Sequence, residues 1–263
     1  VDATARLEEA KGLALAIGFL TLFVAAIVAA FSLRYMRADR RSARFFVTLG
    51  LLVAVVLAFL FTNSLIVLAA AWCASGWLLA GLIGHSEGWR EAEAAAWRAR
   101  LAFIAGDAAL LAALGLFGWH AGSSQAHVVL AGASTLSPLQ INAAALLLVV
   151  AAAARCALPP FSGWLLSSMT APTPVSALMH AGLVNAGGFL LVRFAPVLEA
   201  APVARMAAVA LGLRGAIYGI GIMLVRPDVK RALAGSTVSQ MGFMIMSCGL
   251  GAYAATLWHI VAH

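Results

Sequence analysis

Charged residues are scarce in this sequence. Only 10% of its 263 residues are Asp, Glu, Lys or Arg, whereas 63% are hydrophobic. A soluble domain of this length could not bury so much apolar surface. The composition therefore excludes an ordinary water-soluble protein and indicates a chain whose main solvent is the lipid bilayer.

The chain also has few cysteines and no motif for a bound cofactor. Its three cysteines, Cys73, Cys156 and Cys248, lie in or beside apolar stretches and show no CxxC spacing. Such cysteines are usually small buried hydrophobic residues. No phosphate loop, haem attachment motif, iron–sulfur motif or dinucleotide fingerprint is present. We therefore expect neither redox chemistry nor a cofactor in this chain.

Apolar stretches long enough to cross a bilayer recur along the sequence. A spanning helix needs roughly 17–25 such residues. We expect spans near 12–33, 45–61, 64–84, 101–118, 139–157, 174–194, 203–225 and 232–250, with a ninth beginning near residue 252. The predicted fold is an all-α, polytopic membrane helix bundle, one transmembrane domain over 1–263. Neither end has the signals of a chain terminus, and we expect a segment of a longer protein.

The net charge of +7 comes from basic residues gathered in alternate loops. Five arginines lie in 34–44, three in 85–100, and two arginines with one lysine in 226–231. The intervening connections hold two arginines, both within 193–205. This asymmetry predicts that the basic loops face the cytoplasm of a bacterial inner membrane protein. Basic residues confined to short loops between spans argue against nucleic-acid binding.

Four prolines interrupt the apolar sequence between two spans. Pro159 and Pro160 end one span, and Pro172 and Pro174 open the next after a short amphipathic stretch. A proline cannot donate a backbone hydrogen bond, so it breaks or ends a helix. Broken helices at membrane depth are tolerated where they line a cavity or a polar path. The sequence therefore predicts a proline-broken transmembrane helix beside a hydrated pocket.

Polar side chains flank this predicted break. Arg155 precedes it, and His180 and Asn185 follow it within an apolar span. An imidazole gains or loses a proton near neutral pH, which suits a proton relay. A guanidinium stays charged, so Arg155 is expected to set the local field or hold an anion. The alternative for His180 is a structural hydrogen bond to a neighbouring helix.

Further ionisable residues are candidates for an ion pathway. Asp107 is the one acid within a predicted span, where proton handling and structural pairing with an arginine are both open. His259 and His263 share a helix face, a spacing that could chelate zinc, but no third ligand lies nearby in sequence. Lys230 lies at a helix edge, where membrane anchoring is the simplest explanation.

Several long motifs resemble one family. The chain is similar to the proton-conducting antiporter-like subunits, which include subunit L of NADH–quinone oxidoreductase and the large subunit of multisubunit Na⁺/H⁺ antiporters. The resemblance rests on GWL at 163–165, PTPVSALMH at 172–180, DVKRALAGSTVSQMG at 228–242, HIVAH at 259–263, RYM at 34–36 and RFF at 44–46. It covers nearly the whole chain and implies an antiporter-like membrane fold.

Other motifs resemble one branch of that family, the membrane subunits of DAB-type inorganic-carbon accumulation complexes. These are HAGLVNAGGF at 180–189, FSGW at 161–164 and LGAYA at 250–254. The branch implies a subunit that conducts H⁺ or Na⁺, H⁺ being expected here. It also implies a large cytoplasmic partner similar to a β-carbonic anhydrase, whose zinc hydrates CO₂ to bicarbonate in a reaction driven or gated by the ion gradient.

The chain departs from the respiratory members of the family at two charged positions. They carry a glutamate where this chain has Cys73, and a lysine where it has Arg155. These differences put the full respiratory pumping cycle in doubt. Three functions therefore stay open: a conducting subunit for a CO₂-hydrating partner, a proton-pumping subunit of a respiratory complex, and a membrane anchor that conducts nothing.

Overall fold

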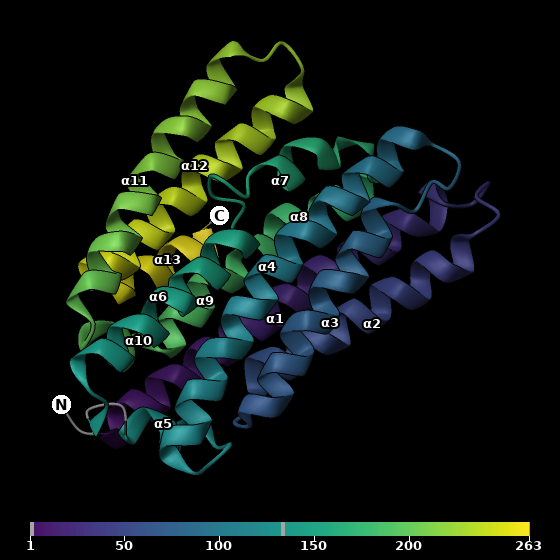
Figure 1. Ribbon diagram of the computed structural model, residues 1–263. Coiled ribbons are helices and arrows are strands. Elements are labelled where there is room, and N and C mark those ends of the chain that lie inside the picture. The colour runs from purple at the N-terminus through teal and green to yellow at the C-terminus, as the bar shows by residue number, and fades with distance from the viewer. Residues whose placement is uncertain (1–2, 133–134, 263) are drawn as a thin grey trace.

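The computed structural model describes residues 3–132 and 135–262, and within these ranges the only regular elements are helices (Figure 1). In chain order they are α1 (Ala3–Tyr35), α2 (Ser42–Phe61), α3 (Leu65–Ile83), α4 (Arg90–Ala121), α5 (Ala126–Ala131), α6 (Pro138–Arg155), α7 (Gly163–Ser167), the 3₁₀ turn η2 (Ser168–Thr170), α8 (Thr173–Ala181), the 3₁₀ turn η3 (Leu183–Asn185), α9 (Ala186–Arg193), α10 (Ala195–Glu199), α11 (Pro202–Val225), α12 (Val229–Leu250) and α13 (Tyr253–Ala262). The all-α fold predicted from the sequence is confirmed.

Seven segments in the described ranges are long and apolar enough to span a membrane, and they match seven of the eight expected spans. The eighth expected span, 232–250, lies within helix α12. This helix has the necessary length, but its first half carries the polar residues Ser236, Thr237, Ser239 and Gln240. α12 packs along α11, so that polar half is partly covered by protein. The expected ninth helix begins at Tyr253.

The basic loops lie at one end of the bundle. Figure 1 shows the α1–α2, α3–α4 and α11–α12 connections at the upper and right-hand end. The α2–α3, α4–α5 and α10–α11 connections lie at the opposite end. The charge asymmetry in the sequence thus becomes an asymmetry between the two ends of the fold, as a helix bundle crossing a membrane requires.

Glycines allow α11 and α12 to pack closely. A Cβ atom added to Gly212 would lie 2.5 Å from the Gly242 carbonyl oxygen, and one added to Gly219 would lie 2.4 Å from the Ser239 nitrogen. These obstacles are backbone atoms, which cannot move aside as a flexible side chain can. Small residues at such crossings are typical of membrane helices, whose association depends on close packing.

The chain is interrupted twice around the predicted break. α6 ends at Arg155, a turn follows in which Ala157 has φ 53° and the Pro159–Pro160 bond is cis, and α7 then begins. Pro172 and Pro174 do not interrupt a helix, because they form the N-cap and first turn of α8, where a missing N–H is tolerated.

A second interruption corrects the sequence prediction. The expected continuous span 174–194 is divided at Gly182, which has φ −139° and ψ −57°, followed by the η3 turn and α9. No proline lies at this point. A helix break caused by a glycine between two packed helices has a much weaker sequence signal than one caused by proline.

Candidate functional site

Arg155 forms the centre of a buried polar site. It is the last residue of α6, and only 2% of its surface is exposed. Its Nη1 donates to Ser75 Oγ at 3.1 Å, and its Nη2 donates to the Trp72 carbonyl oxygen at 2.9 Å. Because both acceptors lie on α3, the guanidinium joins α6 to α3 inside the bundle.

Two aromatic rings enclose the same guanidinium. Arg155 Cζ lies 4.4 Å from the centre of the Trp72 ring and 4.8 Å from that of Phe103. A cation over an aromatic face is attracted by the quadrupole of the ring, and more strongly where water is excluded. Gly76 leaves room for the charge, since a Cβ added there would lie 3.1 Å from Arg155 Nη1.

Asp107 on α4 supplies the counter-charge. Its Oδ1 lies 3.5 Å from Arg155 Nη2, and its residue surface is 6% exposed. Burying an isolated charge is very costly, so the two groups depend on each other. The sequence left open whether Asp107 pairs with an arginine, and the structure places that ion pair in the interior.

The site therefore contains an acid that the sequence comparison with respiratory members did not reveal. The resemblance to those members implies a glutamate at the position of Cys73, which lies on α3. The Cys73 thiol lies within interaction distance of the Asp107 carboxylate. The negative charge is thus present at this place but comes from the neighbouring helix, which only the three-dimensional fold brings there.

His180 forms a second polar contact, between α8 and α12. Its Nδ1 lies 2.9 Å from Thr237 Oγ1. Thr237 Oγ1 also lies 3.1 Å from the Leu233 carbonyl oxygen, which can accept the hydrogen of the hydroxyl. The sequence analysis did not single out Thr237, which is one hydroxyl in a polar run of α12.

Asn185 is the most isolated of the polar candidates. It ends the η3 turn, is 4% exposed, and neither amide atom has a hydrogen-bond partner among the described residues. A buried polar group left unpaired costs about 1–3 kcal/mol. The neighbouring carbonyl oxygen of Val184 accepts from Cys156 Sγ at 3.1 Å, which ties this turn to the end of α6.

The remaining candidates lie apart from this site. Lys230 is exposed at the start of α12, where the Asp228 side chain caps the helix by accepting from the backbone N–H of Lys230. His259 is half-buried on α13. His263, the other half of the expected i,i+4 pair, lies outside the described residues. Within the described ranges, no group of three His, Cys, Asp or Glu residues is placed to hold a metal.

A cavity lies between α3 and α4. Its volume is about 680 Å³, its lining is mainly Leu, Ala and Gly, and Cys73 borders it while His180 does not. The prediction of a hydrated pocket around His180 is thus not matched by this cavity. It reaches instead the thiol that lies beside Asp107.

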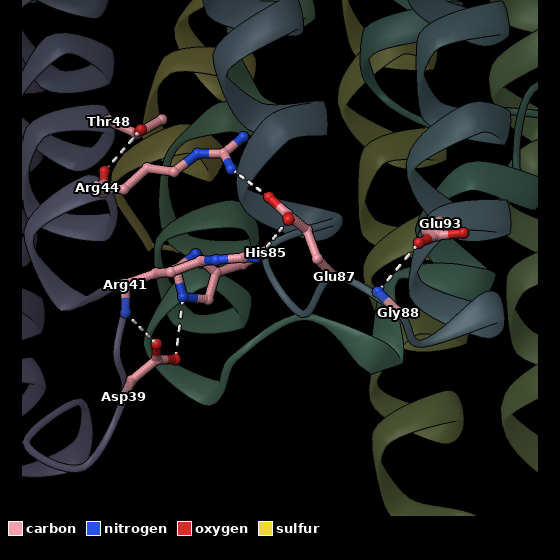
Figure 2. Close-up of polar contacts among 8 residues, drawn as sticks. All are labelled: Asp39, Arg41, Arg44, Thr48, His85, Glu87, Gly88 and Glu93. Carbon is pink, nitrogen blue, oxygen red and sulfur yellow. Dashed lines mark hydrogen bonds and ion pairs between the residues drawn. The ribbon is translucent and has the colours of Figure 1, made fainter.

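A separate network ties together two loops at the basic end of the bundle (Figure 2). Asp39 accepts from the Arg41 backbone N–H at 2.7 Å and lies 3.1 Å from His85 Nε2. Glu87 pairs with Arg41 and Arg44, each at 2.5 Å. The Arg41 N–H and the contact with His85 lower the pKa of Asp39 against a smaller effect of burial. The hydrogen bond from Arg44 lowers the pKa of Glu87.

Comparisons with known proteins agree with this architecture. Residues 62–263 match the family model described as NADH:quinone oxidoreductase/Mrp antiporter, TM. The chain is 37% identical over 256 residues to a probable inorganic carbon transporter subunit DabB of Bacillus anthracis, covering 95% of this chain and 49% of the relative. It is 35% identical over 246 residues to NADH-quinone oxidoreductase subunit L of Mycobacterium tuberculosis (strain ATCC 25618 / H37Rv), covering 91% of this chain and 38% of the relative.

A solved structure has the same fold. The Mrp complex from Dietzia sp. DQ12-45-1b superposes with a TM-score of 0.89 at 31% sequence identity, over 95% of this chain and 28% of the other. The antiporter-like fold expected from the sequence is therefore confirmed. The chain spans about half the length, or less, of the curated relatives that it matches.

Proposed function

Because the chain belongs to the NADH:quinone oxidoreductase/Mrp antiporter family, we propose that it is a cation-conducting membrane subunit of an inorganic-carbon transporter. H⁺ is the proposed cation. The conducted ion energises a partner similar to a zinc carbonic anhydrase, which hydrates CO₂ so that bicarbonate accumulates. The zinc belongs to that partner, which docks at the basic end of the bundle on the cytoplasmic side of a bacterial inner membrane.

The proposal of ion conduction rests on one observation, the buried ion pair between Arg155 and Asp107. Ionisable groups in spanning helices are expensive, and they commonly mark ion paths. Here the pair joins α6 and α4 at 3.5 Å, with Arg155 enclosed by two aromatic rings. A purely structural role would not require charged residues here, since an apolar pair of the same size would hold these helices together without the cost of desolvating two charges.

Each polar group has a distinct role in this proposal. Arg155 stays protonated and sets a positive field, and Asp107 offsets that field from the neighbouring helix. His180 is the group beside the helix breaks that can exchange a proton near neutral pH. Its bond to Thr237 fixes the ring orientation, so that a proton is delivered and removed at a defined position.

The respiratory alternative is a proton-pumping subunit of an NADH–quinone oxidoreductase-type complex. It is favoured by the 35% identity with subunit L. Co-purification of the native complex separates the two proposals. A single large zinc-binding partner supports the inorganic-carbon proposal, whereas several quinone-binding or iron–sulfur subunits support the respiratory one.

The anchor alternative is tested by transport. We would measure bicarbonate uptake by the full complex in a carbonic-anhydrase-deficient bacterial host, with and without an uncoupler. We expect uncoupler-sensitive uptake that His180→Ala abolishes without dissociating the complex. The control is His120→Ala, because His120 Nε2 also contacts a threonine hydroxyl, that of Thr135 at 3.0 Å, but at the exposed end of α4. If neither the uncoupler nor His180→Ala changes bicarbonate uptake, conduction through this chain is refuted and the function as a non-conducting membrane anchor is supported.

A further inference from the structure

The interruption between α8 and α9 presents a polar side chain that the surrounding protein does not satisfy. Asn185 is more than nine-tenths buried, yet its Oδ1 and Nδ2 have no hydrogen-bond partner in the part of the chain that the structure describes. An amide group has two donor hydrogens and an acceptor oxygen. Nearly all buried polar groups find a partner in the protein or in ordered water.

The turn that carries Asn185 is held between two helices of the site. The carbonyl oxygen of Val184 accepts a hydrogen bond from the thiol of Cys156, the residue that follows α6. A Cβ added to Gly187 would lie 2.7 Å from the Ala152 carbonyl oxygen of α6, and one added to Gly188 would lie 2.4 Å from Met244 Sδ of α12. The break thus fits tightly between the helix that ends in Arg155 and the helix that carries Thr237.

The local backbone explains why a ligand belongs at this break. Gly182 N donates to the Leu178 carbonyl oxygen, which is the last α-helical bond of α8, whereas Asn185 N donates to the carbonyl oxygen of Gly182, three residues back, so the backbone turns more tightly over η3 than in an α-helix. Waters commonly enter the hydrogen-bond ladder at such interruptions and bridge polar groups that the helix leaves open. Asn185 places an amide there with both of its polar ends unoccupied by the described protein groups.

We propose that Asn185 binds an ordered water at the α8–α9 break and that this water is a station on the proton path beside His180. This inference rests on the proposed conduction of H⁺. The water accepts a proton on one lone pair and releases another from its opposite side, so its composition is unchanged. Asn185 does not ionise but holds the oxygen in place, which makes it a positioning residue.

Water suits this position better than a bound sodium ion. The Asn185 side chain offers one neutral oxygen and no carboxylate, and the Val184 carbonyl oxygen is already engaged by Cys156. Hard cations prefer several oxygen ligands, usually including a negative charge.

The functional test compares two asparagines in the full complex. Asn185→Leu removes the amide at nearly the same volume, and we expect uncoupler-sensitive uptake to fall at least 10-fold while the melting temperature stays the same or rises. The control is Asn142→Leu, because Asn142 bonds the Pro138 carbonyl oxygen at 2.8 Å and the Val203 N–H at 3.0 Å. This control should lower the melting temperature and retain uptake. Asn185→Ser, which keeps a hydroxyl, should recover part of the lost uptake.

The direct test is high-resolution electron cryomicroscopy of the full complex, wild type against Asn185→Leu. We expect density for a water about 2.7–3.2 Å from an amide atom of Asn185, absent in the variant. Density with shorter, metal-like contacts together with uptake that requires Na⁺ would overturn the proposal. So would an amide bonded directly to protein with no water, or wild-type uptake in Asn185→Leu. If the wild type shows the water but no uncoupler-sensitive uptake, the proposed function fails while the binding site stands.

Discussion

Replacing Asp107 with asparagine tests whether the buried ion pair is an energetic unit. The change preserves size and removes the negative charge that lies 3.5 Å from Arg155 Nη2. Coulomb's law at an effective dielectric constant of about 20 gives roughly 5 kcal/mol for unit charges at this separation. Removing one partner of a buried pair typically destabilises a protein by about 3–5 kcal/mol, because the other charge stays buried without compensation.

The expected result is a large loss of stability that is localised to this pair. For a chain of this size a loss of that magnitude lowers the melting temperature by on the order of 10 °C. The assay is thermal unfolding of the purified protein in lipid nanodiscs, wild type against Asp107→Asn. Glu87→Gln is the control, since Glu87 also pairs with arginines but at the exposed end of the bundle, where we expect no measurable change.

A double variant makes the test decisive. Asp107→Leu combined with Arg155→Met removes both charges, and we expect it to be more stable than Asp107→Asn alone, because no unpaired charge is left. If Asp107→Asn is as mild as Glu87→Gln, or if the double variant is the least stable of all, the guanidinium does not depend on Asp107 and the assignment of the pair is wrong.

Two further predictions concern packing and pH. Gly212→Ala should destabilise the protein by about 1–3 kcal/mol in unfolding measurements, because its Cβ would meet α12 backbone atoms, whereas Gly221→Ala, with open space in the same helix, should be neutral; equal effects would refute the close packing. The folded-state pKa of Asp39 is lowered from 3.8, so its contact with Arg41 and His85 stabilises the protein above pH 3.8 and is lost as pH falls below that value. Protection of residues 36–41 against hydrogen exchange, taken relative to the intrinsic exchange rate at each pH, should fall in acid, and Asp39→Asn should remove this pH dependence; protection in the variant that still falls in acid would contradict the reasoning.

Local sequence rules worked well for the helices of this protein. Seven expected spans matched because a run of about 20 apolar residues must form a helix in lipid, where each backbone group needs an internal partner. Proline positions marked the end of α6 and the start of α8 because they follow from the missing N–H of a single residue. The break at Gly182 could not be read in this way, since glycine permits a break without requiring one.

The same distinction between local and long-range information applies to the candidate site. From sequence alone, Arg155, Asp107, His180 and Asn185 were recognisable as polar residues at membrane depth, because such residues are costly wherever they occur. Their partners were not recognisable. Thr237 lies 57 residues from His180, and Asp107 lies 48 residues from Arg155.

The sequence by itself determined that this chain is a helical membrane protein with a charged interior and one basic end. Those properties follow from which residues can face lipid, and they need no knowledge of how the helices pack. Only the tertiary structure decided that the acid beside Cys73 comes from α4, that a threonine orients His180, and that the amide of Asn185 is left without a bond from the described protein. Each of these depends on the distance between helices that are remote in the chain, which the pattern of a single helix does not contain.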